Sequence, residues 1–242
     1  MSVNARAALL MTLAMAGFAF EDALLKFLSS DLSIGQLLLL LGFGGMVAFG
    51  AWVALGPEGL RWRDLIHPGV LLRNLCEAVC GVFFLTAISI GDLAIASAIL
   101  QALPLLMTLG AALILGEKVG WRRWASIGAG FLGVLMIVRP GTDAFQPGSV
   151  LALVAVLFLA VRDLVTRRLP ASIGSGLLTA SAFGSMSLAG AALVVVGGQP
   201  LIAPDPALTA NLLRMANSAY FGMRREIESV GHAVTLMGTK RV

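Results

Sequence analysis

The chain has 242 residues, of which 58% are hydrophobic and only 12% carry a charge. Because about a quarter of the residues in a soluble domain are charged, this chain has too few polar side chains to cover one water-soluble globule. Its formal net charge of +4 is too small for its length to indicate a basic nucleic-acid-binding domain, and its hydrophobicity excludes intrinsic disorder. The composition predicts a polytopic membrane protein, with the lipid bilayer and no nucleic acid among its partners.

Seven apolar segments follow one another along the chain, joined by short connections. They cover residues 7–27, 34–55, 70–90, 93–115, 121–138, 149–166 and 174–197. Backbone that crosses lipid has to satisfy its own hydrogen bonds, so each segment is predicted to be a helix. The predicted fold class is an all-α polytopic membrane protein with about seven transmembrane helices.

The charges of the connections predict the orientation. Cations are concentrated in the N-terminal stretch and in the connections after the second, fourth and sixth segments, whereas the opposite connections carry mainly acidic residues. Cytoplasmic loops of membrane proteins hold the excess of Lys and Arg. The N-terminus is therefore predicted to be cytoplasmic, and the seventh segment is predicted to end outside.

An internal repeat relates the first two segments to the last two. The stretch "EDALLKFLSSDLSIGQLLLLLGFGGM" from Glu21 runs beside "RDLVTRRLPASIGSGLLTASAFGSM" from Arg162, with Asp22 opposite Asp163. An odd number of helices separates the two copies, so the second copy crosses the membrane in the opposite direction. Such inverted-topology repeats are common in secondary transporters. Chance alignment of two apolar stretches is the alternative.

The sequence changes character after residue 197. Charged residues become denser from Asp205 to Val242, and no apolar run there approaches the length of a span. Two short soluble helices are predicted around 206–218 and 229–238, the second with Ser229 as its N-cap. This tail would place its cations outside, against the pattern of the earlier connections, so it is predicted to be a separate piece.

Ionisable side chains inside predicted spans are costly and are candidates for function. We expect them to line a polar cavity between the first, third, fourth and sixth segments that binds a charged or zwitterionic metabolite. Arg73 and Glu77 lie four apart on one helical face and can pair directly. The alternative is that such pairs only fix helix packing. The substrate-binding candidates are Glu21, Asp22, Arg73, Asn74, Glu77, Gln101, Pro104, Arg162 and Asp163.

The fourth segment has a proline in its interior. Pro104 removes a backbone donor and is predicted to open the helix near the middle of the membrane, where Gln101, one turn earlier, offers an amide to a substrate. Glu117 follows this segment directly. Either it pairs with neighbouring cations at the helix end, or it forms a cytoplasmic gate salt bridge.

Motifs of enzyme chemistry are weak in this sequence. The "GAGFLG" at 128–133 has the spacing of a dinucleotide-binding loop, but no strand precedes it and it lies within an apolar span. Its glycines instead indicate close helix packing. The histidines and the two cysteines, Cys76 and Cys80, have no further ligands at metal spacing. We expect no enzymatic activity, no cofactor and no metal.

The segment "LPLLMTLGAALILGEKVGWRRWASIGAGFLGVLMIVRPG" at 103–141 resembles the end of an EamA-type repeat of the drug/metabolite transporter superfamily. The likeness lies in a proline-bearing fourth helix, a "GE" at its end and a glycine-rich fifth helix closing in "RPG". Residues 71–99 and the "RDLVTRRLP" at 162–170 are similar to the same family. The resemblance implies ten helices in two inverted five-helix repeats.

The tail at 205–242 is similar to an internal piece of an HDOD domain, a soluble helical module of bacterial signalling proteins. The residues "LLRMANSAYFG" and the later "HAV" and "RV" carry this likeness. Two partial resemblances that meet near 198–205 suggest a fusion or a frameshift at this junction.

These patterns predict three domains: a first EamA-like repeat at 1–141, the first two helices of an inverted second repeat at 142–199, and a tail at 200–242. The resemblance implies a secondary transporter that exports a small polar metabolite across the bacterial inner membrane by alternating access. Helices eight to ten of the family are missing here, so we expect this chain not to transport by itself. A membrane-tethered regulatory protein is the alternative function. The sequence leaves both a monomer and a homodimer open as oligomeric states.

Overall fold

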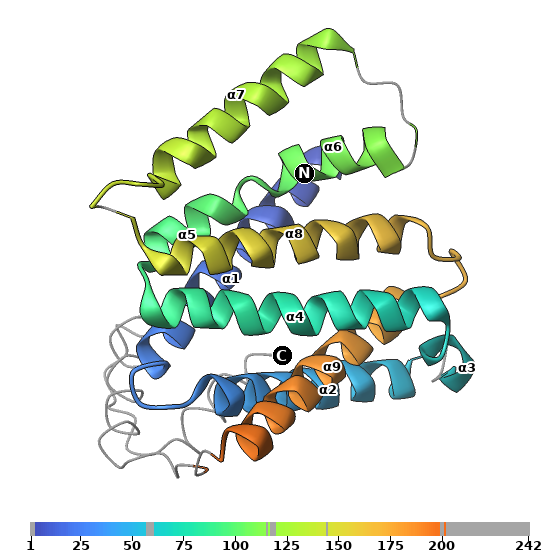
Figure 1. The fold of residues 1–242 in the computed structure, drawn as a ribbon. Coiled ribbons are helices and arrows are strands. Elements are labelled where there is room, and N and C mark those ends of the chain that lie inside the picture. Colours follow the sequence, from blue (N-terminus) through green and yellow to red (C-terminus); the bar gives the residue numbers. More distant parts are fainter. Residues whose placement is uncertain are drawn as a thin grey trace, which may run out of the picture. The chain divides into compact units, whose positions relative to one another are not determined.

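The computed structural model describes residues 3–56, 61–114, 116, 120–143, 145–198 and 201. Residues 1–199 form one compact unit and residues 200–242 a second, so the two helices predicted in the tail lie outside the described residues. Every element of the described chain is a helix (Figure 1). The helices are α1 (Val3–Leu28), α2 (Ile34–Leu55), α3 (Trp62–Leu65), α4 (Pro68–Ile90), α5 (Leu93–Leu100), α6 (Leu103–Ile114), α7 (Trp121–Val138), α8 (Pro147–Arg167) and α9 (Ser175–Gly197).

The all-α membrane fold predicted from composition is confirmed. Six helical stretches of the described chain are long and apolar enough to cross a membrane, with α5 and α6 together forming one of them. The remaining predicted span, α7, is helical but is not among the six. It begins with "WRRW" at 121–124, and two arginines in its first turn lower the hydropathy of a helix of only 18 residues.

Local capping sets where several helices begin. The Ser33 hydroxyl accepts a hydrogen bond from the Gln36 backbone N–H at the start of α2. His67 does the same for Gly69 at the start of α4, and Asp92 for Ala94 at the start of α5. Side-chain acceptors at these positions satisfy backbone donors that the first helical turn leaves free. The short polar connections therefore end one span and start the next.

Two pairs of helices dominate the packing: α2 lies along α9, and α4 lies along α8. Glycines bring α2 and α9 together. A Cβ on Gly42 would lie 2.7 Å from the Phe183 carbonyl oxygen, and a Cβ on Gly190 would lie 2.6 Å from the Gly35 carbonyl oxygen. Only small residues allow such backbone approach. Of the two pairs of segments that the proposed repeat aligns, α2 and α9 thus pack directly on each other.

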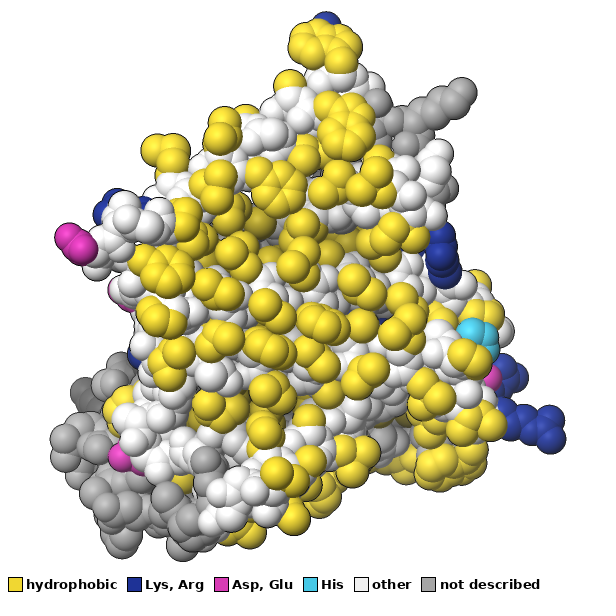
Figure 2. Space-filling view, in the orientation of Figure 1, with side chains coloured by type: hydrophobic (Ala, Val, Ile, Leu, Met, Phe, Trp, Pro, Cys, Tyr) yellow, Lys and Arg dark blue, Asp and Glu magenta, His cyan; other side chains and the backbone are white. Residues whose placement is uncertain are grey.

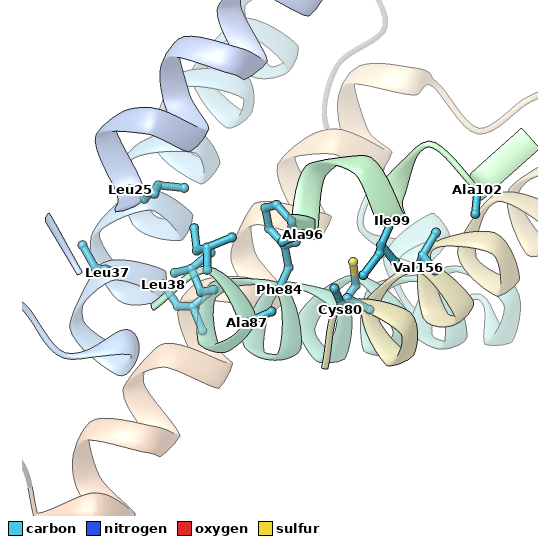
Figure 3. Packing of buried hydrophobic residues seen from close by; sticks show 14 of the residues in the cluster. Leu25, Leu37, Leu38, Cys80, Phe84, Ala87, Ala96, Ile99, Ala102 and Val156 are labelled. Atoms are coloured by element: carbon cyan, nitrogen blue, oxygen red, sulfur yellow. The ribbon is translucent and has the colours of Figure 1, made fainter. Parts of the chain in front are cut away.

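The main core joins α1, α2, α4, α5, α7 and α8. Figure 3 shows part of it, where Leu38, Phe84, Ile99 and Val156 lie among neighbouring apolar side chains. In α7, Gly130 packs against Leu105, whereas a Cβ at its other glycines would meet nothing within 4 Å. The close packing predicted from the α7 glycines therefore holds at one position.

The outer surface is apolar across its middle. Hydrophobic side chains cover the central part of the visible face in Figure 2, while basic and acidic side chains lie toward its two ends. Large apolar side chains such as Trp52, Leu188 and Val195 are exposed. This is the surface expected of helices that face lipid.

Candidate functional site

A group of polar side chains lies inside the unit, where α4, α8 and α9 meet. We call it the polar cluster. Its members are Arg73, Asn74 and Glu77 from α4, Arg162, Asp163 and Thr166 from α8, and Ser181 and Ser185 from α9. Five of the nine sequence-predicted binding residues belong to it.

Arg162 is the centre of the charges in the polar cluster. Its Nη1 lies 2.6 Å from Glu77 Oε2 on α4, and its Nη2 lies 2.7 Å from Asp163 Oδ1, which belongs to α8 like Arg162 itself. The three side chains are 22%, 18% and 30% exposed, respectively. One guanidinium therefore forms ion pairs with two carboxylates in a largely buried position, which a planar group with five donors can do with good geometry.

Arg73 bonds to three acceptors instead of pairing with Glu77 as the sequence suggested. It is 9% exposed, and it donates to Thr166 Oγ1 at 3.2 Å, to Asn74 Oδ1 at 3.3 Å and to the Leu178 carbonyl at 3.1 Å. Glu77 takes Arg162 as its partner because α8 brings this second cation against α4. The direct Arg73–Glu77 pair is therefore a wrong expectation, and Arg73 instead ties α4 to α8 and α9.

Asn74 connects the polar cluster to α9. The Ser185 hydroxyl donates to the Asn74 carbonyl at 2.9 Å, and the Ser181 hydroxyl lies 3.3 Å from Asn74 Oδ1. The sequence reasoning missed Thr166, Ser181 and Ser185. The two serines lie four residues apart and so share one helical face, a signal that could have indicated them.

Glu21 and Asp22 lie apart from these bonds, on α1. No hydrogen bond or ion pair within the described chain joins either carboxylate to the polar cluster. The neighbouring Lys26 has a structural role instead: its Nζ donates to the carbonyls of Ile88 at 2.5 Å and Gly91 at 2.9 Å, at the end of α4. A cation at this position satisfies free carbonyls and complements the helix dipole.

The break predicted in the fourth segment is present. α5 ends at Leu100 and α6 begins at Leu103, with Pro104 in the first turn of α6. Gln101 lies in the break and is exposed, so its amide is not part of the polar cluster. Glu117 lies outside the described residues. Within the described chain, no group of three His, Cys, Asp or Glu side chains could hold a metal ion.

Both resemblances seen in the sequence are confirmed by comparison with known families. The EamA-like transporter family matches residues 5–139, and the HDOD domain matches residues 199–242. No solved structure matches the chain significantly.

Three curated relatives show what the first part of the chain is similar to. A riboflavin transporter of Rhizobium johnstonii is 30% identical over 132 residues, which is 53% of this chain and 42% of the relative. A riboflavin transporter of Vibrio cholerae is 39% identical over 72 residues, 30% of this chain and 24% of the relative. An S-adenosylmethionine uptake transporter of Rickettsia prowazekii is 25% identical over 127 residues, which is 52% of this chain and 42% of the relative.

In each case the match covers less than half of the relative's length. The match to the family, in contrast, covers more than half of the present chain. The chain therefore belongs to the EamA-like transporter family.

Proposed function

We propose that this chain provides the substrate-binding part of a secondary transporter that moves a small polar metabolite across the bacterial inner membrane by alternating access. The observation that carries the proposal is the ion pair of Arg162 with Glu77, which joins two membrane-spanning helices, together with the second carboxylate of Asp163 beside it. Ionisable groups within spans are rare and mark substrate or proton pathways. Membership in the EamA-like family supports the same function.

The mixed charge of the polar cluster favours a substrate that carries both signs of charge. A substrate carboxylate would compete with Glu77 for Arg162, and a substrate cation would take the place of Arg162 beside Glu77. A ligand with a single charge would leave one buried group unpaired, at a cost of about 3–5 kcal/mol. Of the compounds named for the relatives, S-adenosylmethionine carries a carboxylate and two cationic groups, whereas riboflavin is uncharged. A zwitterion of the first kind is the proposed substrate class.

The same contact supplies a mechanism for alternating access. Arg162 holds α8 against α4, and these helices belong to different copies of the proposed inverted repeat. A substrate that separates Glu77 from Arg162 weakens this contact, so the two helices can move apart on one side. The family resemblance favours export, and the uptake named for the Rickettsia relative is the opposite direction. Counterflow driven by substrate loaded on one side of a vesicle membrane distinguishes export from uptake.

The direct test is saturable binding of radiolabelled S-adenosylmethionine to the purified chain in detergent, measured by scintillation proximity. Arg162→Ala is expected to weaken binding by about a hundredfold, the equivalent of about 3 kcal/mol. Arg123→Ala, which removes an exposed arginine of α7, is the matched control and should bind like the original chain. Absent binding, or equal binding by both variants, would refute the proposed site. Binding of riboflavin alone would refute the substrate class.

Transport itself is a separate measurement on reconstituted vesicles. We expect no saturable flux from this chain alone. A saturable flux that Glu77→Gln abolishes would overturn that expectation while supporting the polar cluster as the substrate site.

The match of residues 199–242 to the HDOD domain supports a second candidate function, a membrane-tethered regulatory protein whose tail binds protein partners. A reporter fused to the C-terminus separates the two. A C-terminus outside the cytoplasm would exclude cytoplasmic signalling, and a C-terminus inside would contradict the predicted seven crossings.

A further inference from the structure

A cavity whose lining contains no member of the polar cluster lies where α2 ends and α9 begins. Figure 1 shows these two helix ends at the same end of the bundle. Its volume is about 720 Å³. The short helix α3 and the connection between α8 and α9 complete its wall. The lining residues used below are Trp52, Arg61, Asp64, Ser172, Ser175 and Gly176.

Asp64 brings an unsatisfied acceptor to this cavity. Its Oδ2 atom is buried and has no hydrogen-bond partner within the described chain. A buried carboxylate oxygen without a donor is costly, and such groups in native proteins are almost always satisfied by protein, water or ligand. The Asp64 carboxylate therefore places a negative charge that no donor compensates at its buried oxygen in the wall of the cavity, and this charge favours a cationic group of a ligand nearby.

The first turn of α9 brings free donors to the same cavity. The N-cap residue is Gly174, which has no side chain to cap the helix. The N–H groups of Ser175, Gly176 and Leu177 consequently have no partner inside α9. The start of a long helix also carries the positive end of its dipole and favours an anion, above all a phosphate. Arg61 adds a full positive charge to the wall.

Trp52 places the cavity at the boundary between lipid and water. It lies in the last turn of the span α2 and is 65% exposed. Tryptophans are enriched at this depth of the bilayer. A molecule bound here can therefore hold a charged group between α3 and α9 while an apolar part extends along α2 into lipid.

We propose that this cavity binds a phosphate-bearing zwitterion, with the phosphate at the start of α9 and Arg61 and the ammonium group at Asp64. The phosphoethanolamine headgroup of a bilayer lipid has this chemistry, and a free phosphoethanolamine shares it. The arrangement of one anionic and one cationic subsite predicts a preference over phosphatidylglycerol, whose headgroup has the phosphate and lacks the ammonium.

The test is native mass spectrometry of the full chain in detergent, titrated with phosphatidylethanolamine and phosphatidylglycerol that have identical acyl chains. The original chain is expected to prefer phosphatidylethanolamine by about tenfold, the equivalent of one charge-assisted hydrogen bond. Asp64→Asn should remove that preference, and Arg61→Gln should weaken both lipids. Arg63→Gln is the matched control, because Arg63 lies on α3 and does not line the cavity.

A variant that fills the cavity provides a second test in case a charge substitution alters folding. Ala171→Trp fills the cavity from its exposed wall and should lower the binding of both lipids while the helical circular dichroism stays unchanged. Equal binding of the two lipids by the original chain, or equal effects of Asp64→Asn and Arg63→Gln, would overturn the proposal. Competition by soluble O-phosphoethanolamine would assign the site to the free compound, and a preference that survives the competitor would assign it to the lipid.

Discussion

Replacing Arg162 by methionine removes the cation that Glu77 and Asp163 share. Methionine keeps much of the apolar length of the side chain but leaves two neighbouring carboxylates without the contacts of 2.6 and 2.7 Å. Removing one partner of a buried ion pair costs about 3–5 kcal/mol of unfolding free energy. Because these side chains keep 18–30% exposure, we expect a loss near the lower limit, about 3 kcal/mol. Glu77→Gln should cost less, about 1 kcal/mol, since Arg162 keeps Asp163 as its partner.

The assay is unfolding of the purified chain in mixed micelles, followed by helical circular dichroism. Arg123→Met on the exposed face of α7 is the control for loss of an arginine and should change stability by no more than about 0.5 kcal/mol. The double variant Glu77→Gln with Arg162→Met should be more stable than the sum of the single effects predicts, because it removes one of the two uncompensated carboxylates. An effect of Arg162→Met no larger than that of Glu77→Gln, or strict additivity, would refute the pairing.

The other contacts that fix the helices give two further predictions for the same assay. Gly42→Ala is expected to lower the unfolding free energy by about 1–3 kcal/mol, because its Cβ would meet the backbone of α9, whereas Gly44→Ala, whose Cβ meets nothing within 4 Å, should be neutral or stabilising. Equal effects would contradict the close approach of α2 and α9. Lys26→Met should cost about 1.5–3 kcal/mol through loss of its bonds to the end of α4, with Arg6→Met on the exposed part of α1 as the control. A loss no larger than that of the control would show that the Lys26 contacts do not stabilise the bundle.

The helices and the break between α5 and α6 could be predicted because each depends on local sequence. A long apolar run has to be helical in lipid, and Pro104 disrupts hydrogen bonding wherever its helix lies. The fifth predicted span, at 121–138, was predicted with the same argument, but the arginines at the start of α7 make that helix less apolar than its neighbours. Length alone was therefore a weaker guide there than composition.

The partners within the polar cluster could not be predicted, because they depend on how one helix is rotated against another. Spacing within α4 places Arg73 and Glu77 on one face, but it contains no information about the approach of Arg162 from α8. Ser181 and Ser185 were missed for the same reason. The sequence shows them only as small residues of a span, and the packing of α9 is what places them beside Asn74. The cost of burying polar groups indicated five members of the polar cluster, and the packing of α8 and α9 on α4 decided their bonds.

The proposed inverted repeat would give a physical reason for the different surroundings of its two acidic positions. Asp22 on α1 aligns with Asp163 on α8, yet the structure pairs only Asp163 with a cation, and α4 supplies the carboxylate that completes that group. Under the symmetry of the repeat, the helix that faces Glu21 and Asp22 would be the second-repeat counterpart of α4. Under the proposed repeat, the polar cluster would be one of two related half-sites, and the α1 carboxylates would belong to the other. Substitutions at Asp163 should therefore disturb the described bundle more than the same substitutions at Asp22.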